Sequence, residues 1–142
     1  MKITIFSDGG ARGNPGPAAA AFTAEIRNPK SEIRNFKKAI FIGTATNNQA
    51  EYRAVIEALR WVRKNVAEPD LEIECFLDSE LIVEQLNQRY KLKNEGLKPL
   101  FWEVRDQVMQ LGGKVTFKYI PREKNKEADR LVNEALDNRD KQ

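Results

Sequence analysis

The chain has 142 residues, of which 41% are hydrophobic, and its 24 Lys and Arg against 21 Asp and Glu give a formal net charge of +3. This composition predicts one soluble, monomeric domain over residues 1–142, located in the cytoplasm. The charge balance permits a polyanionic partner. A membrane-spanning helix is excluded, because it needs about 20 consecutive apolar residues. The absence of histidine excludes Ser-His-Asp and Cys-His nucleophiles, so any hydrolysis must use carboxylates, lysines, tyrosines or a bound metal.

Three segments have the alternation or β-rich composition of strands, and all precede any helical pattern: residues 2–7, 18–27 and 32–43. The first shows no cleavable signal arrangement and is expected to stop at the Asp-Gly-Gly of residues 8–10. Residues 11–17 are dense in turn formers and predict a fixed loop. Residues 28–30 predict a hairpin turn, so the sheet should begin antiparallel.

The period of the apolar residues changes at Asn48, and from there to Val66 it is that of a helix. The apolar residues recur at three- and four-residue steps and form one stripe: Val55, Ala58, Leu59, Val62 and Val66. Thr46 or Asn47 can cap the start of this helix. We expect Pro69-Asp70 to end the segment.

The rest of the chain predicts a strand at 72–77, helices at 79–88 and 97–111, a strand at 114–120 and a helix at 125–136. The only cysteine, Cys75, lies in an apolar run, which is typical of a small core residue in a reducing compartment. The helix at 79–88 is expected to bury Leu81, Ile82, Gln85 and Leu86. The order β-β-β-α-β-α-α-β-α predicts an α/β domain, a five-stranded mixed sheet flanked by helices.

Four acidic residues are placed differently from ordinary solvated charges: Asp8, Glu51, Asp78 and Asp129. Asp8 and Asp78 each follow an apolar strand, where sites gather in open α/β sheets. Glu51 and Asp129 fall on or beside apolar helix stripes, where a carboxylate is costly unless it is paired or metal-bound. Each one alone is typical of a cap or a buried ion pair. Together they indicate a hard cation such as Mg²⁺, although sequence spacing does not establish that they converge.

Four stretches occur in the order and spacing of a known family, and each holds one of these acidic residues: FSDGGARGNPGPAA at 6–19, TNNQAEYRAVIEAL at 46–59, FLDSELIVEQL at 76–86 and PREKNKEADRLVNEAL at 121–136. On these motifs the chain resembles the type 1 ribonuclease H family (ribonuclease HI) over nearly its whole length. The resemblance implies the ribonuclease H fold. It also implies an endonuclease that hydrolyses the RNA strand of RNA–DNA hybrids and leaves 5′-phosphate and 3′-hydroxyl ends.

The same resemblance implies roles for the acidic residues. Asp8, Glu51 and Asp78 look like metal ligands, with Asp8 bridging two Mg²⁺ ions, for which Mn²⁺ can substitute. Asp129 looks like the ligand that completes one metal site and helps to position the attacking water. Catalysis by metal is consistent with a hydrolase that has no histidine.

Eight further residues match family positions that contact the substrate: Gly9, Gly10, Arg12, Gly13, Asn14, Thr46, Asn47 and Asn48. The three asparagines are implied to contact sugar and phosphate, where an amide suits the 2′-hydroxyl that distinguishes RNA from DNA. The arginine and the threonine are candidate phosphate contacts on the DNA strand, and the glycines allow backbone amides to approach the RNA. A helix cap at Thr46 or Asn47, and simple turn geometry for the glycines, are the alternatives.

The chain departs from many relatives in two places. Only residues 87–96 join the second and third helices, so the additional basic helix, or handle, is missing, as in archaeal and some bacterial members; some of these also cut double-stranded RNA. The loop before Asp129 lacks the histidine that many relatives have. Glu123 is a candidate substitute as a proton acceptor, Arg122 and Lys124 are candidate phosphate contacts, and we expect slower turnover than in histidine-containing relatives.

Basic residues surround Tyr90 and precede Trp102: Arg89, Lys91, Lys93 and Lys98. This pattern fits a nucleic-acid groove with an aromatic platform, and it fits equally well a solvated loop followed by a half-buried core tryptophan. Two other functions share the expected fold, a non-catalytic nucleic-acid-binding module and an enzyme that cuts DNA. The presence of all four carboxylates argues against the first, and the Asn47-Asn48 pair and the short chain disfavour the second.

Overall fold

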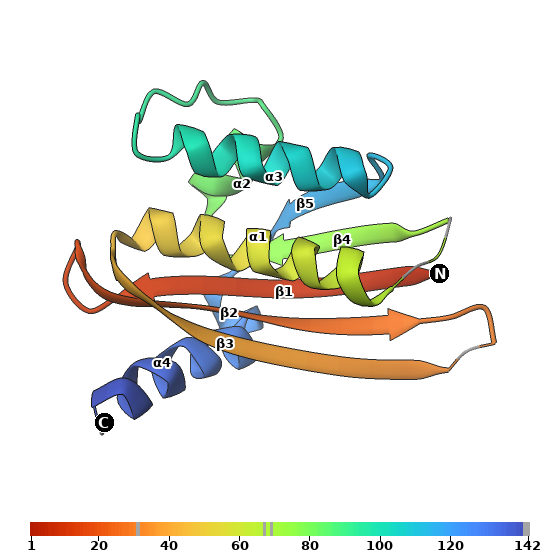
Figure 1. Ribbon diagram of the computed structural model, residues 1–142, viewed down its shortest axis with the longest axis horizontal. Helices are drawn as coiled ribbons and strands as arrows, with labels where there is room; N and C mark the ends of the chain where they lie inside the picture. The colour runs from red at the N-terminus through yellow and green to blue at the C-terminus, as the bar shows by residue number, and fades with distance from the viewer. Residues whose placement is uncertain (31, 67, 69, 141–142) are drawn as a thin grey trace.

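The computed structural model describes residues 1–30, 32–66, 68 and 70–140. Within them, five strands form one mixed sheet in the order β3-β2-β1-β4-β5. The strands are β1 (Lys2–Ala11), β2 (Gly16–Arg27), β3 (Ile33–Ala45), β4 (Glu72–Leu77) and β5 (Val115–Tyr119). The first three pair antiparallel, whereas β4 pairs parallel with both β1 and β5 (Figure 1). The predicted five-stranded mixed sheet is therefore confirmed.

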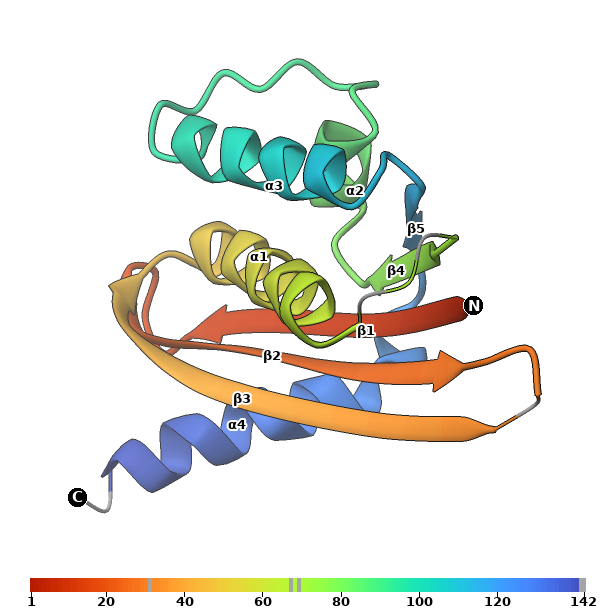
Figure 2. The ribbon, with the colours of Figure 1, turned by 45° about the vertical axis from the view of Figure 1, so that its right-hand side comes forward.

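Helices cover both faces of this sheet. Over the described ranges they are α1 (Asn47–Asn65), α2 (Glu80–Leu86), α3 (Lys98–Gln110) and α4 (Lys126–Asp140), with a short 3₁₀ turn at Arg122–Lys124. The first three helices lie on one face and α4 lies on the other (Figures 1 and 2). The element order matches the predicted one. None of these helices combines the length and the apolar character that would be needed to cross a membrane.

The helix α1 begins and packs as its sequence predicts. The hydroxyl of Thr46 accepts a hydrogen bond from the Gln49 backbone amide at 3.1 Å, and the Gln49 side chain accepts one from the Thr46 amide at 2.9 Å, which forms a capping box. The predicted apolar stripe of α1 is buried against the sheet. Pro69, which was predicted to end this segment, lies outside the described residues, and the last helical residue is Asn65.

Apolar side chains fill both interfaces between helices and sheet. The larger cluster lies between the sheet and α1, α2 and α3, and includes Ile3, Ile5 and Phe22 from the strands. The smaller cluster lies between the sheet and α4: Ala19, Ala21, Leu131, Val132 and Leu136. Burial of each large aliphatic side chain contributes about 1.5–3 kcal/mol, so the three from α4 are sufficient to hold this helix against β2. Two interfaces with apolar packing therefore fix the helices that carry Glu51 and Asp129.

The strand β1 is longer than predicted. It was expected to stop at residues 8–10, but it continues through Asp8 to Ala11 and pairs there with Ala18–Ala21 of β2. The Asp-Gly-Gly sequence suggested a turn, but glycine also adopts extended conformations and the alanines of β2 leave room for the pairing. The parallel pairing of β1 with β4 stops earlier, at Phe6 and Phe76. The two strands therefore separate immediately before Asp8 and Asp78.

One side chain of α2 was assigned to the wrong face. Leu81 was expected to be buried, but 44% of it is exposed, whereas Ile82, Gln85 and Leu86 are buried as predicted. The helix has only seven residues, and in so short a segment the adjacent Leu81 and Ile82 give equally good stripes about 100° apart. Gln85 is buried because its side-chain oxygen accepts a hydrogen bond from the Tyr52 hydroxyl at 2.8 Å.

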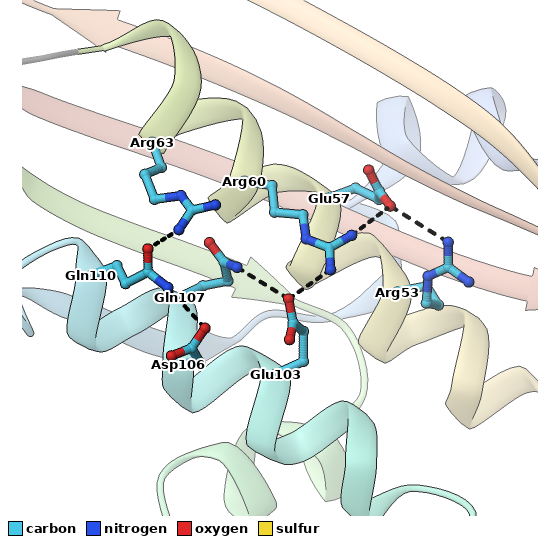
Figure 3. Close-up of polar contacts among 8 residues, drawn as sticks. All are labelled: Arg53, Glu57, Arg60, Arg63, Glu103, Asp106, Gln107 and Gln110. Atoms are coloured by element: carbon cyan, nitrogen blue, oxygen red, sulfur yellow. Dashed lines mark hydrogen bonds and ion pairs between the residues drawn. The ribbon is translucent and has the colours of Figure 1, made fainter.

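Polar side chains join α3 to α1 along their exposed rim (Figure 3). Arg60 donates to Glu103 at 2.6 Å, and Gln107 donates to the same carboxylate at 3.1 Å. These contacts hold the pKa of Glu103 below its ordinary value, the hydrogen bond from Arg60 being the largest cause. Arg63 also donates to Gln110 farther along the same rim. Because exposed ion pairs contribute only about 0–1 kcal/mol each, this network fixes the orientation of α3 more than it stabilises the fold.

The single cysteine is a core residue, as predicted. Cys75 pairs with Ile5 of β1 and Phe117 of β5 in the middle of the parallel part of the sheet. Its side chain is fully buried, and this burial raises the pKa of the thiol to about 12.

Candidate active site

Three of the four predicted carboxylates converge. Asp8 comes from β1, Glu51 from the first turns of α1 and Asp78 from the residue after β4. One oxygen atom from each lies within 4.8 Å of the corresponding atoms of the other two. Asp8 is only 4% exposed and Glu51 only 7% exposed, so solvent does little to screen their mutual repulsion. We call this group the carboxylate cluster.

The backbone around Gly9 is what brings Glu51 to Asp8. A Cβ atom on Gly9 would lie 2.2 Å from the carbonyl carbon of Ala50 and 2.5 Å from the backbone nitrogen of Glu51, distances at which atoms overlap. Only glycine therefore permits the N-terminal part of α1 to lie directly on β1. The separation of β1 from β4 opens the other side of Asp8, and Asp78 enters from there.

The electrostatics of the cluster favour protons or cations. The pKa of Asp8 is raised from 3.8 to about 7, first by burial and then by the charges of Asp78 and Asp129, while the hydrogen bonds with Glu51 and the Gly9 amide act in the opposite direction. The pKa of Glu51 also lies well above its ordinary value, first because of burial and then because of the charges on Asp8 and Asp78. Buried like charges at this separation cannot all ionise without a compensating cation.

The cluster also fits a divalent metal ion by its donor set. Oε2 of Glu51 is buried and has no hydrogen-bond partner among the described residues, and an unpaired buried carboxylate oxygen is costly. Hard cations such as Mg²⁺ prefer carboxylate oxygens and keep some of their water. Asp8, Glu51 and Asp78 are therefore the residues that can hold a metal.

Asp129 lies at the same cleft but outside the group of three. It is half-buried in the first turn of α4, and with Asp8 and Glu51 it lines a cleft of about 360 Å³. We call this space the carboxylate cleft. The charge of Asp129 contributes to the raised pKa of Asp8, so these two carboxylates interact. The structure thus brings all four predicted acidic residues to one region, with Asp129 on the wall opposite α1.

The eight predicted substrate contacts divide into two groups. Gly9, Gly10, Arg12 and Asn47 line the carboxylate cleft. The remaining four are not among its lining residues: Gly13, Asn14, Thr46 and Asn48. Gly13 has a φ of +96°, as turn geometry requires. Arg12 is paired with Asp137 of α4, with 2.5 Å between its guanidinium nitrogen and the carboxylate oxygen.

The asparagines fix the loop between β1 and β2 to the start of α1. Oδ1 of Asn14 accepts a hydrogen bond from the Asn47 backbone amide at 3.0 Å, and Oδ1 of Asn47 accepts one from the Ala11 amide at 2.8 Å. Since Thr46 supplies the helix cap, the alternative of a cap at Asn47 is wrong. Asn47 also lines the carboxylate cleft.

The three auxiliary candidates follow β5 in the 3₁₀ turn. Arg122 lines the carboxylate cleft, whereas Glu123 and Lys124 are exposed and are not among its lining residues. The next residue, Asn125, was not singled out from the sequence. It is 2% exposed and donates a hydrogen bond to Asp78 at 3.1 Å. Its position before a helix is so common for asparagine that the sequence carries no separate signal for this contact.

The basic and aromatic residues between α2 and α3 form a separate surface. Residues 87–97, all of which the structure describes, contain no helix. Tyr90 is 52% exposed and Trp102 is 66% exposed, so the alternative of a half-buried core tryptophan is wrong. Both line a groove of about 560 Å³ together with Arg89, Lys91 and Lys98. Arg89 is paired with Glu84, and Lys98 with Glu95.

The raised pKa of Asp8 predicts how stability changes with pH when no metal is present. Between about pH 4 and pH 7 the folded protein keeps a proton on Asp8 that the unfolded chain releases, so the free energy of unfolding should fall as pH rises through this window. Glu51 acts in the same direction. The carboxyl groups whose pKa is lowered, such as Glu103, act in the opposite direction, so the measurement starts at pH 5, above the ordinary pKa of 4.5 of this side chain.

We expect the midpoint of urea unfolding in EDTA to decrease from pH 5 to pH 7. The corresponding decrease in the free energy of unfolding should be on the order of a few kcal/mol. The same titration at saturating Mg²⁺ should be flat, because the cation replaces the proton. A midpoint in EDTA that rises or stays constant over this range would contradict the raised pKa values of Asp8 and Glu51.

Comparisons with known proteins agree with the fold. Residues 6–135 match the model of a family described as reverse transcriptase-like. The chain is 38% identical over 137 residues to the bifunctional protein Rv2228c of Mycobacterium tuberculosis, covering 96% of this chain and 36% of that protein. It is 33% identical to the ribonuclease HI of Halobacterium salinarum, covering 96% and 65%. The chain thus spans about a third to two thirds of the length of these relatives.

Solved structures give a closer match in length. LC11-RNase H1, isolated from compost by a metagenomic approach, superposes with a TM-score of 0.86 at 43% identity, covering 96% of both chains. The structure of LC11-RNase H1 in complex with an RNA/DNA hybrid superposes with a TM-score of 0.85 at 42% identity, covering 96% of this chain and 97% of that one. The strand order and the clustered carboxylates define a protein of the ribonuclease H fold class. Within that class, the chain belongs to the type 1 ribonuclease H family.

Proposed function

We propose that the protein hydrolyses the RNA strand of RNA–DNA hybrids as an endonuclease, leaving 5′-phosphate and 3′-hydroxyl ends. The observation that carries this proposal is the convergence of Asp8, Glu51 and Asp78 within 4.8 Å at the separation of β1 and β4. Membership of the type 1 ribonuclease H family supports it, and so does the hybrid bound by the similar LC11-RNase H1. We further propose that residues 1–142 act as one monomeric catalytic domain.

In this proposal the carboxylate cluster holds two Mg²⁺ ions, for which Mn²⁺ can substitute. Asp8, Glu51 and Asp78 would hold these ions, and Asp129 would contribute a further carboxylate from α4. Divalent ions bound there supply an activated water and stabilise the leaving 3′ oxygen. The chain itself contributes the fixed spacing of the oxygens, and Asp129 orients the attacking water by accepting its hydrogen bond.

Substrate recognition is proposed for the rim of the carboxylate cleft. The backbone amides of Gly9, Gly10 and Gly13 face the RNA strand, and the amides of Asn14, Asn47 and Asn48 contact its sugars and phosphates, which reads the 2′-hydroxyl. Arg12 and Thr46 contact phosphates of the DNA strand. Because Arg12 is paired with Asp137, a phosphate must compete with that carboxylate for the guanidinium.

Two further regions have proposed roles in catalysis and binding. Arg122, at the cleft, contacts the phosphate next to the cut, with Lys124 as a second phosphate contact and Glu123 as a proton acceptor in place of a histidine. Tyr90 and Trp102 offer exposed rings beside basic side chains, which suits stacking with unpaired bases or sugars at the ends of a duplex.

The test is cleavage of matched labelled duplexes. RNA–DNA, RNA–RNA and DNA–DNA duplexes of one sequence are incubated with the protein in Mg²⁺, in Mn²⁺ and in EDTA. We expect cleavage of the RNA strand in the hybrid, products with 5′-phosphate ends and no activity in EDTA. Slower cutting of the RNA–RNA duplex would add double-stranded RNA as a second substrate. No cleavage with either metal would indicate a binding module, and preferential cutting of the DNA duplex would indicate a DNA nuclease.

A further inference from the structure

Asn125 connects three of the segments that carry the acidic residues. It lies between the 3₁₀ turn and α4 and is 2% exposed. Its Nδ2 group donates to the backbone oxygen of Ser7, the neighbour of Asp8, at 2.8 Å, and to Oδ2 of Asp78 at 3.1 Å. Its backbone oxygen accepts the amide of Asp129 at 3.2 Å. One residue thus contacts β1 next to Asp8, the side chain of Asp78 and the backbone of Asp129.

These contacts occur where the hydrogen-bonded pairing between β1 and β4 ends, just before Asp8 and Asp78. The parallel ladder between β1 and β4 ends at Phe6 and Phe76. The carbonyl of Ser7, one residue later, is buried and receives its hydrogen bond from Asn125. The side-chain amide of Asn125 therefore supplies a hydrogen bond to the β1 backbone at the first residue after the pairing with β4 ends.

The chemistry of the amide group is specific for this position. A primary amide carries two hydrogens on one nitrogen, so it can donate to a carbonyl and to a carboxylate at the same time. An aspartate here could only accept, and a serine hydroxyl is too short to reach both oxygens. Oδ1 of Asn125 is buried without a partner among the described residues. An unpaired buried oxygen lowers stability, which is unfavourable for a residue that serves stability alone.

We propose that Asn125 is a positioning residue that sets the spacing and orientation of Asp8, Asp78 and Asp129 for divalent metal binding. It touches neither substrate nor reacting atoms, and it acts through the carboxylates that it holds. This inference rests on the proposed function, because it assigns metal binding to the carboxylate cluster. Residues that orient metal ligands typically change metal affinity by about 10- to 100-fold when they are replaced.

The test compares metal affinity in matched variants of the whole chain. Asn87 is the control, because its side chain also donates to a backbone oxygen, that of Phe117 at 3.0 Å, but belongs to the end of α2. Isothermal titration with Mn²⁺ should give a dissociation constant at least about tenfold higher for Asn125→Ala. Asn87→Ala should leave this constant unchanged while lowering the unfolding temperature in EDTA. If Asn125→Ala does not fold, Asn125→Ser is used, since serine also favours a helix start, and the same increase is expected.

Cleavage of the hybrid gives a second readout. The Mg²⁺ concentration at half-maximal rate should rise in the Asn125 variant by the same factor as the Mn²⁺ dissociation constant, with little change in KM for the hybrid. Unchanged Mn²⁺ affinity in both Asn125 variants would overturn the inference and leave the proposed function standing. A wild-type protein that binds Mn²⁺ but does not cut the hybrid would refute the proposed function, while lower affinity of the variants would still support the role of Asn125.

Discussion

Replacing Asp8 by asparagine is expected to lower the rate of hybrid cleavage by at least about a thousandfold while the protein remains folded. Asp8 is the central member of the carboxylate cluster, and its carboxylate interacts with Glu51, Asp78 and Asp129. Metal-assisted stabilisation of the transition state contributes several kcal/mol, and each 1.4 kcal/mol or so corresponds to a tenfold change in rate. The measurement is the single-turnover rate of RNA cleavage at saturating Mg²⁺.

The same variant should be more stable than the wild type when metal is absent. An asparagine of similar size carries no charge, so Asp8→Asn removes the buried charge whose desolvation, together with repulsion from the neighbouring carboxylates, raises the pKa of Asp8 to about 7. In EDTA at pH 8 the gain should be on the order of 2 kcal/mol, and the stabilisation by Mg²⁺ should largely disappear. Asp106→Asn, on the exposed rim of α3, is the matched control and should change neither property. Near-normal cleavage by Asp8→Asn would refute the assigned chemistry.

Gly9→Ala is expected to destabilise the fold more than any exposed substitution. The added Cβ would lie 2.2 Å from the Ala50 carbonyl carbon and 2.3 Å from its oxygen, and because both are backbone atoms no side-chain rotation relieves the overlap. Overpacking of this kind costs about 3 kcal/mol, which corresponds to a drop in unfolding temperature of roughly 10 °C for a chain of this size. Separation of α1 from β1 would also move Glu51 away from Asp8, so Mg²⁺ binding should weaken.

Gly10→Ala provides the comparison for stability. A Cβ at Gly10 would make only ordinary contacts, 3.7 Å from a methyl group of Val132 and 4.0 Å from the Asn47 side chain. Thermal unfolding followed by circular dichroism should therefore show a small change for Gly10→Ala and a large one for Gly9→Ala. Equal unfolding temperatures for the two variants would show that the approach of α1 to β1 is not fixed by Gly9.

The element order was predictable because strand alternation and helical periodicity are local properties of the sequence. The end of β1 was not, since glycine is compatible with both a turn and an extended strand, and the choice depends on the alanines of β2 that pair with it. The predicted burial of Leu81 on the inner face of α2 was wrong for a related reason. A helix of seven residues is too short for its periodicity to separate neighbouring stripes.

The four acidic residues were identified from the sequence, but their distances were not. Asp8 and Asp78 were expected at strand ends, and their proximity depends on β1 lying beside β4, a parallel pairing between segments about 70 residues apart. Asp129 comes from the opposite face of the sheet, which explains why it lines the cleft without joining the closest group. The contribution of Asn125 is a tertiary contact between segments distant in sequence, and no local pattern reports it.

The position of Cys75 gives this protein an intrinsic probe of its own opening. The thiol is in the middle of the parallel strands, three residues before Asp78, and its raised pKa leaves almost no thiolate at neutral pH. Reagents that alkylate thiols therefore meet a non-reactive side chain in the native state. Because the sequence contains no other cysteine, the labelling rate measures only opening events in which β4 separates from β1 and β5. The same events would move Asp78 away from Asp8 and so disrupt the carboxylate cluster.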